Sequence, residues 1–393
     1  MALFPSRGDA KSPLLRGDVN LLTERLFPFA VEGNTKGILF ITMGKFLSSK
    51  FNSLTPYDTS EEIESMNGYV RLNTNESPFE PSVKVIKAVR ESARGLNYYC
   101  DPECSLLAEK LAELLNVKKS EIVFGNGSDE ILNFIFMAFC ENGAAFPNIT
   151  YSFYKILADF HGVDYVEIPL RAFRIIPEDY KNLNGRTIFI ANPNAPTGIA
   201  LKLPEIEEII KSNPESLVII DEAYVDFGGD SAKNFIHEYD NVIITRTFSK
   251  SRSMAGARLG FSISCEEISN DIRTIKNTIT PYNINSMTQA AGLAVLEDEE
   301  TTKKNVSMIK HVRESVKNRL VEMGFEVLDS STNFLFAKHK TISGEKIFET
   351  LKRCKIMVRH FSNPEISEYN RITIGSAEQM QIMLEVLKRI VRR

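Results

Sequence analysis

Four short apolar runs of the sequence each end in residues that could do chemistry. The four runs, each with the segment after it, are Glu121–Phe124 before Gly125–Glu130, Thr187–Ala191 before Asn192–Gly198, Leu217–Ile220 before Asp221–Tyr224, and Val242–Thr245 before Arg246–Lys250, with Arg258 eight residues further on. Such runs are typical of strands buried on both faces of a sheet. Ligands of open α/β sheets bind beyond the carboxyl ends of the strands, so we expect these residues to converge on one site.

The first of these segments could cradle a phosphate. Its two glycines let the backbone approach a ligand closely, and Ser128 or Asp129 can cap a following helix whose free N–H groups favour an anion. A plain capped loop between strand and helix explains the same residues equally well when the segment is taken alone. The second segment, Asn192–Gly198, has two prolines and a glycine and is by itself most often a rigid turn.

A carboxylate and an amine follow the other two strands. Burying the charged Asp221 at the end of a strand costs free energy unless a positive charge pairs with it. The sequence therefore predicts that its partner is either a structural arginine or a cationic ligand group. Lys250 in a partly desolvated cleft near other cations would have a lowered pKa and could act as an amine nucleophile, although most lysines are simply solvated.

Taken together, the strand ends provide a phosphate cradle, a carboxylate, a tyrosine, a lysine and an arginine. Pyridoxal 5′-phosphate (PLP) needs an amine for a Schiff base and a carboxylate that keeps its pyridine nitrogen protonated. It also needs hydroxyls, N–H groups and an arginine for its phosphate. The sequence therefore predicts PLP as the cofactor.

The elements that must position these residues alternate along the chain. Segments of helical periodicity lie at Pro81–Ala93, Ser105–Leu115 and Glu205–Lys211, between the strand-like runs. This alternation is typical of a mostly parallel sheet in an α/β domain. After Thr301, a long amphipathic segment at Lys303–Met323 leads into mixed strands and helices that end with Ala377–Val391, which indicates a smaller α+β lobe.

Length and composition agree with a two-lobed globular protein. The 393 residues exceed the roughly 250–300 that one core supports. The net charge of −4 offers no positive field for nucleic acid, and no apolar stretch approaches the roughly 18–20 residues of a membrane span. The 5 cysteines suggest neither a disulfide framework nor a zinc set, so we expect reduced thiols, no metal and a cytoplasmic protein.

The first 42 residues have no clear periodicity. They also lack the order of charged, apolar and small residues that a signal peptide has. We expect residues 1–42 to be an upstream extension outside the fold, with Met43 as a plausible second start. A genuine additional arm is the alternative.

Beyond these deductions, the motif order resembles that of fold-type I PLP aminotransferases, and within them the histidinol-phosphate aminotransferase family. The motifs are LTPY at Leu54–Tyr57, LNTNESP at Leu72–Pro78, YCDPE at Tyr99–Glu103, GNGSDE, TYSFY at Thr150–Tyr154, NPNAPTG, DEAY and TFSKxxxMAGxRLGF at Thr247–Phe261. The resemblance runs from about Phe46 to the C-terminus. It implies transamination of L-histidinol phosphate with 2-oxoglutarate, giving imidazole acetol phosphate and L-glutamate in histidine biosynthesis. Threonine-phosphate decarboxylase and aromatic amino acid aminotransferase are the alternatives.

The resemblance also implies roles at the cofactor. Lys250 would form the Schiff base and carry the proton, Asp221 would pair with the pyridine nitrogen, and Tyr224 would hydrogen-bond the ring hydroxyl. Tyr151 would stack on the ring, or else simply pack. The remaining implied contacts are the backbone N–H groups of Ser128 and Asp129, the side chains of Ser249 and Arg258 at the phosphate, and Tyr99 reaching the phosphate of a partner subunit in a homodimer with shared active sites. Asp129 and Glu130 would themselves cap the helix.

Substrate contacts follow in the same way. Arg371 matches the arginine for the substrate's anion, Arg359 and Tyr57 match secondary phosphate contacts, and Asn75 lies in a subfamily motif. A flexible arginine pair can serve the carboxylate of glutamate or the phosphate of histidinol phosphate.

Two residues depart from the family pattern. Ala195 precedes Pro196 where the family often has Asn, so Asn194 becomes the candidate for the ring hydroxyl. Cys100 replaces the usual Pro after Tyr99.

The expected domains are an extension at 1–42, an N-terminal arm with part of the small domain at 43–74, a large PLP-binding domain at 75–300 and a small C-terminal domain at 301–393.

Overall fold

A computed structural model of the protein describes residues 45–51, 54 and 59–392. Two compact units divide the chain at Asn52 and Ser53. The described part of the first unit contains a short 3-10 turn at Ser49–Phe51. The other helices and the strands of the described chain belong to the second unit. The expected extension at 1–42 and the candidate residue Tyr57 lie outside the described residues.

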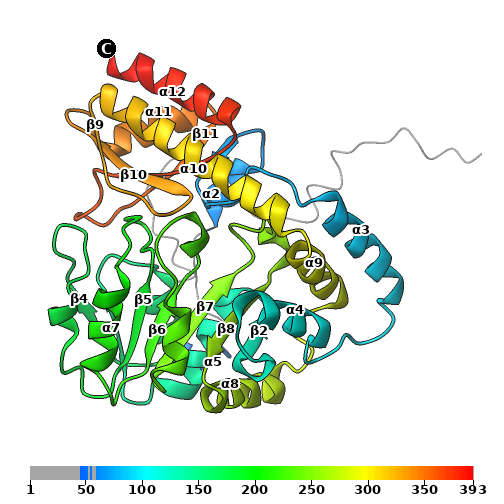
Figure 1. Cartoon of the computed structure of the whole chain (residues 1–393). Coiled ribbons are helices and arrows are strands. Elements are labelled where there is room, and N and C mark those ends of the chain that lie inside the picture. The colour runs from blue at the N-terminus through cyan, green and yellow to red at the C-terminus, as the bar shows by residue number, and fades with distance from the viewer. Residues whose placement is uncertain (1–44, 52–53, 55–58, 393) are drawn as a thin grey trace, which may run out of the picture. The chain divides into compact units, whose positions relative to one another are not determined.

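The second unit contains two β-sheets with helices packed around them (Figure 1). Its strands are β1 Val70–Leu72, β2 Ile122–Gly125, β3 Ala144–Pro147, β4 Tyr165–Ile168, β5 Thr187–Ala191, β6 Val218–Asp221, β7 Val242–Thr247, β8 Gly260–Ser264, β9 Phe325–Val327, β10 Phe334–His339, β11 Ile356–His360 and β12 Asn370–Thr373. Its helices are α2 Ser60–Ser65, α3 Val83–Ser92, α4 Ser105–Leu115, α5 Ser128–Phe139, α6 Phe153–His161, α7 Leu203–Lys211, α8 Glu266–Ile279, α9 Ser286–Leu296, α10 Glu299–Glu322, α11 Gly344–Arg353 and α12 Ala377–Val391.

The larger sheet has seven strands in the order β2-β8-β7-β6-β5-β3-β4. Its neighbours from β7 to β4 run parallel, while β8 runs antiparallel to both β2 and β7. The register places Asp221 of β6 beside Ala191 of β5 and Thr245 of β7. Because parallel strands end at the same edge, the polar segments after β5, β6 and β7 emerge together.

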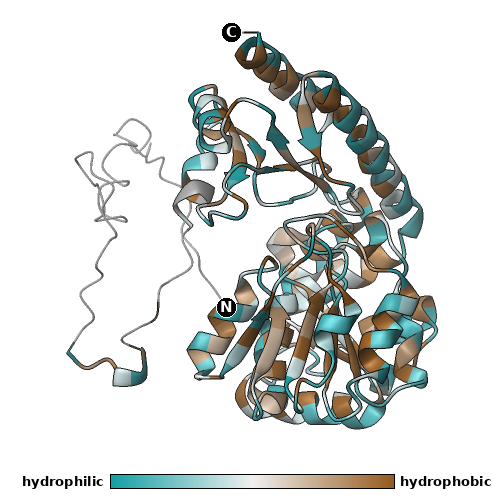
Figure 2. Ribbon diagram, turned by 90° about the vertical axis from the view of Figure 1, so that its left-hand side faces the viewer, coloured by the Kyte–Doolittle hydropathy of each residue, from teal (hydrophilic) through white to brown (hydrophobic). Residues whose placement is uncertain are grey.

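The strands of this sheet are apolar throughout because both faces are covered. Alternate residues such as Ile188 and Ile220 pack toward α4, α7 and α9, whereas Phe189 and Ile219 pack toward α5, α6 and α8. Figure 2 shows the strands in brown between helices that turn teal faces outward. This arrangement explains why the sequence shows continuous apolar runs rather than an alternating pattern.

The smaller sheet has five strands in the order β1-β11-β12-β10-β9. β1 lies parallel to β11 although Val70 and Ile356 are far apart in sequence, and the other neighbours run antiparallel. Residues of α10, α11 and α12 share one apolar core with this sheet. On the opposite face, Phe336 packs with Ile149, Ile366 and Tyr369.

The predicted architecture, a mostly parallel mixed sheet with a smaller α+β part, is therefore confirmed. The four apolar runs predicted as strands coincide with β2, β5, β6 and β7 to within a few residues. Sequence reasoning missed β3, which ends in a proline, and β4, whose middle residues Val166 and Glu167 are exposed at the sheet edge. Among the described residues, no helix is long and apolar enough to cross a membrane.

Candidate functional site

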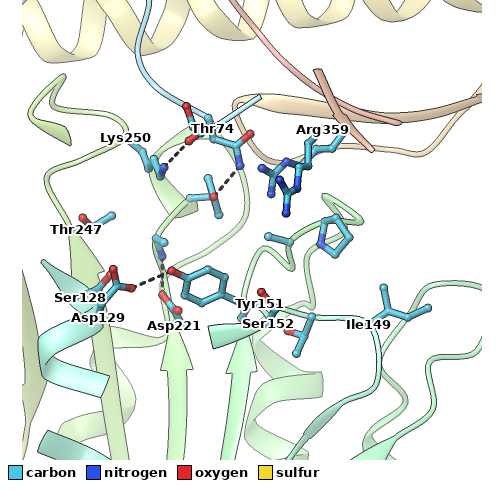
Figure 3. A pocket seen from close by; sticks show the side chains of 18 of the residues that line it. Thr74, Ser128, Asp129, Ile149, Tyr151, Ser152, Asp221, Thr247, Lys250 and Arg359 are labelled. Carbon is cyan, nitrogen blue, oxygen red and sulfur yellow. Dashed lines mark hydrogen bonds between the residues drawn. The ribbon is translucent and has the colours of Figure 1, made fainter. Parts of the chain in front are cut away.

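A cavity of about 700 Å³ opens at the carboxyl ends of the larger sheet (Figure 3). Its wall combines three parts of the chain that are distant in sequence. The residues that line it include Thr74, Asn75, Ser128, Asp129, Tyr151, Ala195, Asp221, Tyr224, Thr247, Ser249, Lys250, Arg258, Arg359, Phe361 and Arg371. The strand ends singled out by the sequence thus meet one another and also the arginines of β11 and β12.

One end of the cavity is the N-terminus of α5. Gly127 is the N-cap residue, with φ +83°, and a Cβ there would lie 2.3 Å from Arg258 Nη2. A Cβ at Gly260 would lie 2.3 Å from the backbone nitrogen of Ser128. Ser249 and Thr247 line the same end. The small residues leave free helix N–H groups, hydroxyls and a guanidinium around one space, which suits a phosphate.

The prediction that Ser128 or Asp129 caps α5 is wrong. Neither Ser128 nor Asp129 caps α5 through its side chain. Asp129 instead accepts hydrogen bonds from the hydroxyl of Tyr151, at 2.9 Å, and from Arg258 Nη2, at 3.1 Å. Glu130 accepts from the backbone N–H of Asn126 at 2.6 Å. Because the N-cap residue Gly127 has no side chain, its position supplies no side-chain acceptor for the N–H groups of the helix.

At the centre of the site, Asp221 is 4% exposed. Its carboxylate accepts from the hydroxyl of Tyr154 at 2.9 Å and from the backbone N–H of Ala223 at 3.2 Å. Burial raises the pKa of Asp221 to about 6, because it removes the charged carboxylate from water. None of the ion pairs among the described residues includes Asp221.

Arg246, the arginine that could have formed an ion pair with Asp221, has a different partner. Arg246 Nη2 lies 2.7 Å from Glu222, whose carboxylate is buried. Of the two explanations offered by the sequence, a cationic ligand group is the one that Asp221 still requires. A protonated pyridine nitrogen is such a group.

Lys250 reaches the cavity from the loop after β7. Its Nζ donates to the backbone carbonyl of Thr74 at 3.0 Å and lies 6.0 Å from the centroid of the Tyr224 ring. The Tyr224 hydroxyl accepts from Asn75 Nδ2 at 2.9 Å. Asn75 is buried and has φ +56°, a conformation that asparagine tolerates better than most residues.

Across the cavity, Arg359 of β11 and Arg371 of β12 are direct cross-strand partners. Arg371 Nη2 donates to the backbone carbonyl of Asn73 at 2.7 Å, and its guanidinium lies 5.4 Å from the Phe334 ring. Figure 3 shows Arg359 pointing into the cavity, while Tyr151, Asp129 and Asp221 lie toward the strand ends. The cavity therefore has two arginines on the side of the smaller sheet and the buried carboxylate of Asp221 on the side of the strand ends, where Arg258 also lies.

Two predicted site residues lie elsewhere. Asn194 is buried and does not itself line this cavity: its Oδ1 accepts from Thr150, and its Nδ2 donates to the carbonyl of Ile149. The residue of that turn that lines the cavity is Ala195. Tyr99 is 84% exposed and stacks on Tyr282 with ring centroids 4.6 Å apart.

Sequence reasoning missed three contributors. The carbonyl of Thr74 and the ring of Phe361 gave no local signal, since a backbone acceptor and a lone aromatic residue occur in every protein. Tyr154 did leave a signal, because it belongs to the same TYSFY motif as Tyr151.

These residues fit PLP by their chemistry. The α5 N-terminus with Ser249 and Arg258 offers donors for a phosphate, and a glycine at 127 keeps that space open. Asp221 lacks the cation that a protonated ring nitrogen would supply. The Lys250 amine lines the same cavity and can bond to an aldehyde.

Comparison with known proteins decides the family. The model of the family "Aminotransferase class I and II" matches residues 67–387. The chain belongs to this aminotransferase family. The histidinol-phosphate aminotransferase of Brachyspira hyodysenteriae is 46% identical to it over 355 residues, which cover 89% of this chain and 100% of the relative. The resemblance stated from the motifs is therefore confirmed.

Solved structures of other aminotransferases have the same fold. The histidinol-phosphate aminotransferase of Clostridium acetobutylicum is 27% identical with a TM-score of 0.76, covering 82% of this chain and 99% of that one. The enzyme of Sinorhizobium meliloti, solved in complex with PLP, has a TM-score of 0.82 at 23% identity and covers 89% of this chain and 99% of its own. The expected fold type I is confirmed by these neighbours.

Proposed function

We propose that this aminotransferase transfers the amino group of L-histidinol phosphate to 2-oxoglutarate, a step of histidine biosynthesis, with PLP as its cofactor. The observation that carries the proposal is the pair of cross-strand arginines facing the same cavity as Lys250 and Asp221. The pair suits substrates that carry an amine near the lysine and an anion some distance from it. The names of the relatives support the same substrate.

Several residues would hold the cofactor. Lys250 would bond to its aldehyde, Asp221 would pair with its ring nitrogen, and Tyr224 would hydrogen-bond its ring hydroxyl. Ser249, Arg258 and the N–H groups of Ser128 and Asp129 would bind its phosphate. When bound, PLP supplies an electron sink that stabilises the carbanion left when a proton leaves the substrate's Cα.

The remaining chemistry belongs to the chain's own side chains. The Lys250 amine would carry the proton that leaves the Cα, because the amine that bonds to the cofactor's aldehyde lies next to the reacting carbon once substrate has displaced it. Tyr151 would keep the ring plane in place, with its own hydroxyl fixed by Asp129. Arg359 and Arg371 would bind the phosphate of one substrate and the distal carboxylate of the other.

A homodimer with shared active sites belongs to the same proposal. Tyr99, Tyr98 and Leu96 are exposed beside Tyr282, an apolar surface that a second copy of the chain would cover. Tyr99 would then reach the partner's phosphate site, and Tyr57 would contribute to substrate binding.

Location and domain boundaries also remain proposals. All 5 cysteines are free, which supports a cytoplasmic location where thiols stay reduced. The boundaries at 42, 74 and 300 are retained as predictions.

The test is a single half-reaction. The PLP-loaded protein is mixed with histidinol phosphate while the absorbance of the cofactor is followed; we expect rapid conversion to the amine form and recovery when 2-oxoglutarate is added. O-phosphothreonine and phenylalanine serve as competing donors. Faster conversion by phenylalanine, or release of carbon dioxide from O-phosphothreonine, would overturn the proposed substrate.

A further inference from the structure

Tyr154 is buried directly behind the carboxylate of Asp221. It lies in the first turn of α6, is 0% exposed, and does not line the cavity. Its hydroxyl donates to Asp221 Oδ2 at 2.9 Å. Asp221 Oδ1 accepts from the backbone N–H of Ala223 at 3.2 Å, and the Thr245 hydroxyl also favours the charged carboxylate.

The two tyrosines at the start of α6 serve different carboxylates. Tyr151 donates to Asp129 beside the α5 N-terminus, and Tyr154 donates to Asp221 at the end of β6. Their rings meet edge to face with centroids 5.7 Å apart, which fixes both hydroxyls relative to each other. A single short segment therefore orients both acidic groups that line the strand-end side of the cavity.

We propose that Tyr154 is a positioning residue that holds the Asp221 carboxylate ionised and oriented for the ring nitrogen of the cofactor. The inference rests on the proposed PLP site. A buried carboxylate without its donor would lose one charge-assisted hydrogen bond, and its charged form would become harder to maintain. A protonated Asp221 could no longer pair with a protonated ring nitrogen, so the cofactor would bind more weakly.

Other charged and titratable groups also surround Asp221. They are Asp129 of α5, Tyr151 and Tyr154 from the start of α6, Tyr224 after β6, Lys250 after β7 and Arg258 before β8. The charge of Asp129 acts in the same direction as burial and opposes ionisation of Asp221. The Tyr154 hydroxyl acts the other way. Burial raises the pKa of Tyr154 well above its ordinary value, so the hydroxyl keeps its proton at all working pH values.

The experiment measures PLP affinity of the apoprotein by equilibrium dialysis from pH 5 to 9. Tyr154→Phe removes the hydroxyl and keeps the ring. For the wild type we expect affinity to fall as the pH drops through about 6. For Tyr154→Phe the fall should begin about one pH unit higher, the shift expected from losing one hydrogen bond to a charged group. Ionisation of the PLP phosphate affects both proteins equally, so the difference reports Asp221.

Tyr180→Phe is the matched control. Tyr180 is also buried, at 1% exposure, but its hydroxyl has no hydrogen-bond partner among the described residues and lies outside the cavity. Its pH profile should coincide with that of the wild type. A Tyr154→Phe profile that also coincides with the wild type would overturn the inference, whereas a wild type that binds no PLP would overturn the proposed function itself.

A second variant covers the case in which Tyr154→Phe does not fold. Site-specific 3-fluorotyrosine at position 154 retains the hydroxyl and makes it a stronger donor. The fall in affinity should then move to lower pH than in the wild type. Infrared titration of the carboxyl band in the apoprotein measures the pH at which Asp221 titrates without PLP. If this pH is the same in the fluorinated protein as in the wild type, the role of Tyr154 is contradicted.

Discussion

Arg359 and Arg371 stand directly opposite each other on the antiparallel strands β11 and β12, and both line the cavity. Cross-strand partners have Cβ atoms about 5 Å apart, and like charges in that position repel. An anion bound between or beside the two side chains would relieve this repulsion. The pair therefore supports the proposed anion-binding role of the smaller sheet.

Substitution of either arginine should weaken substrate binding. For Arg371→Leu we expect kcat/KM to fall about 10–100-fold for both histidinol phosphate and 2-oxoglutarate, since one charge-assisted contact is lost from each. The melting temperature should fall modestly, because the hydrogen bond to the carbonyl of Asn73 and the contact with the Phe334 ring are lost. Arg353→Leu, at an exposed position on α11, is the control and should change neither. Equal losses for substrates without a distal anion would argue against an anion site.

Lys250 should be indispensable for turnover. Lys250→Ala removes both the covalent link to PLP and the group that carries the Cα proton, and proton transfer alone contributes about 10²–10⁴-fold. We expect no measurable turnover and loss of the absorbance band of the lysine-bound cofactor. Lys155→Ala, which removes a lysine from the cavity rim that pairs with Glu167 at 3.2 Å, should retain both. Full turnover by Lys250→Ala would refute the assignment.

Part of this site could be predicted because Asp221 and Lys250 lie at or just after the ends of strands buried on both faces. The apolar runs before Asp221 and Lys250 had no other good interpretation, and parallel strands bring their ends together. Helices with full periodicity were equally clear: α4 and α12 begin and end where the sequence predicts. At α12, Ser376 and Gln379 form a capping box that marks the start.

What could not be predicted depends on contacts between distant segments. The side-chain amide of Asn194 hydrogen-bonds to the hydroxyl of Thr150 and to the carbonyl of Ile149. The residues of the turn itself do not predict those partners. The ion-pair partner of Arg246 could not be predicted for the same reason, although the alternation of side chains along a strand favours one of two neighbouring carboxylates. Asp221 and Glu222 are neighbours on an extended segment, so they point to opposite faces, and only Glu222 can reach Arg246.

The phosphate cradle should not tolerate a side chain at position 127. In Gly127→Ala the new Cβ would meet Arg258 Nη2 and the backbone would be strained at φ +83°. We expect PLP affinity to fall by about tenfold or more, with a smaller loss of thermal stability. Gly162→Ala separates the two effects, because Gly162 has φ +68° but open space around its Cβ position. That control should lose about 1–2 kcal/mol of stability and no affinity for PLP. Equal affinity losses in both variants would mean that backbone strain alone is responsible.

The apoprotein should become more stable when the charge of Asp221 is removed. The pKa of this carboxyl is about 6 in the fold against an ordinary 3.8, so between these pH values the folded state binds more protons than the unfolded state. Stability therefore falls as the pH rises from about 4 to about 6, by about 3 kcal/mol for a shift of roughly two units, and stays lower above that range. Asp221→Asn can still accept from Tyr154 and carries no charge. At pH 7 its apoprotein should resist urea better than the wild type by up to this amount, and the difference should disappear near pH 4.

Addition of PLP should make the wild type the more stable of the two proteins. A protonated ring nitrogen supplies the missing charge to the wild type, whereas the neutral amide of the Asp221→Asn variant cannot form that ion pair, so the wild type should gain more stability from saturating PLP. Urea denaturation of both proteins, with and without PLP at pH 7, checks the pair of expectations. If the Asp221→Asn apoprotein is less stable than the wild type at pH 7, the protein already stabilises the negative charge of Asp221. The argument for a cationic ligand at this position would then fail.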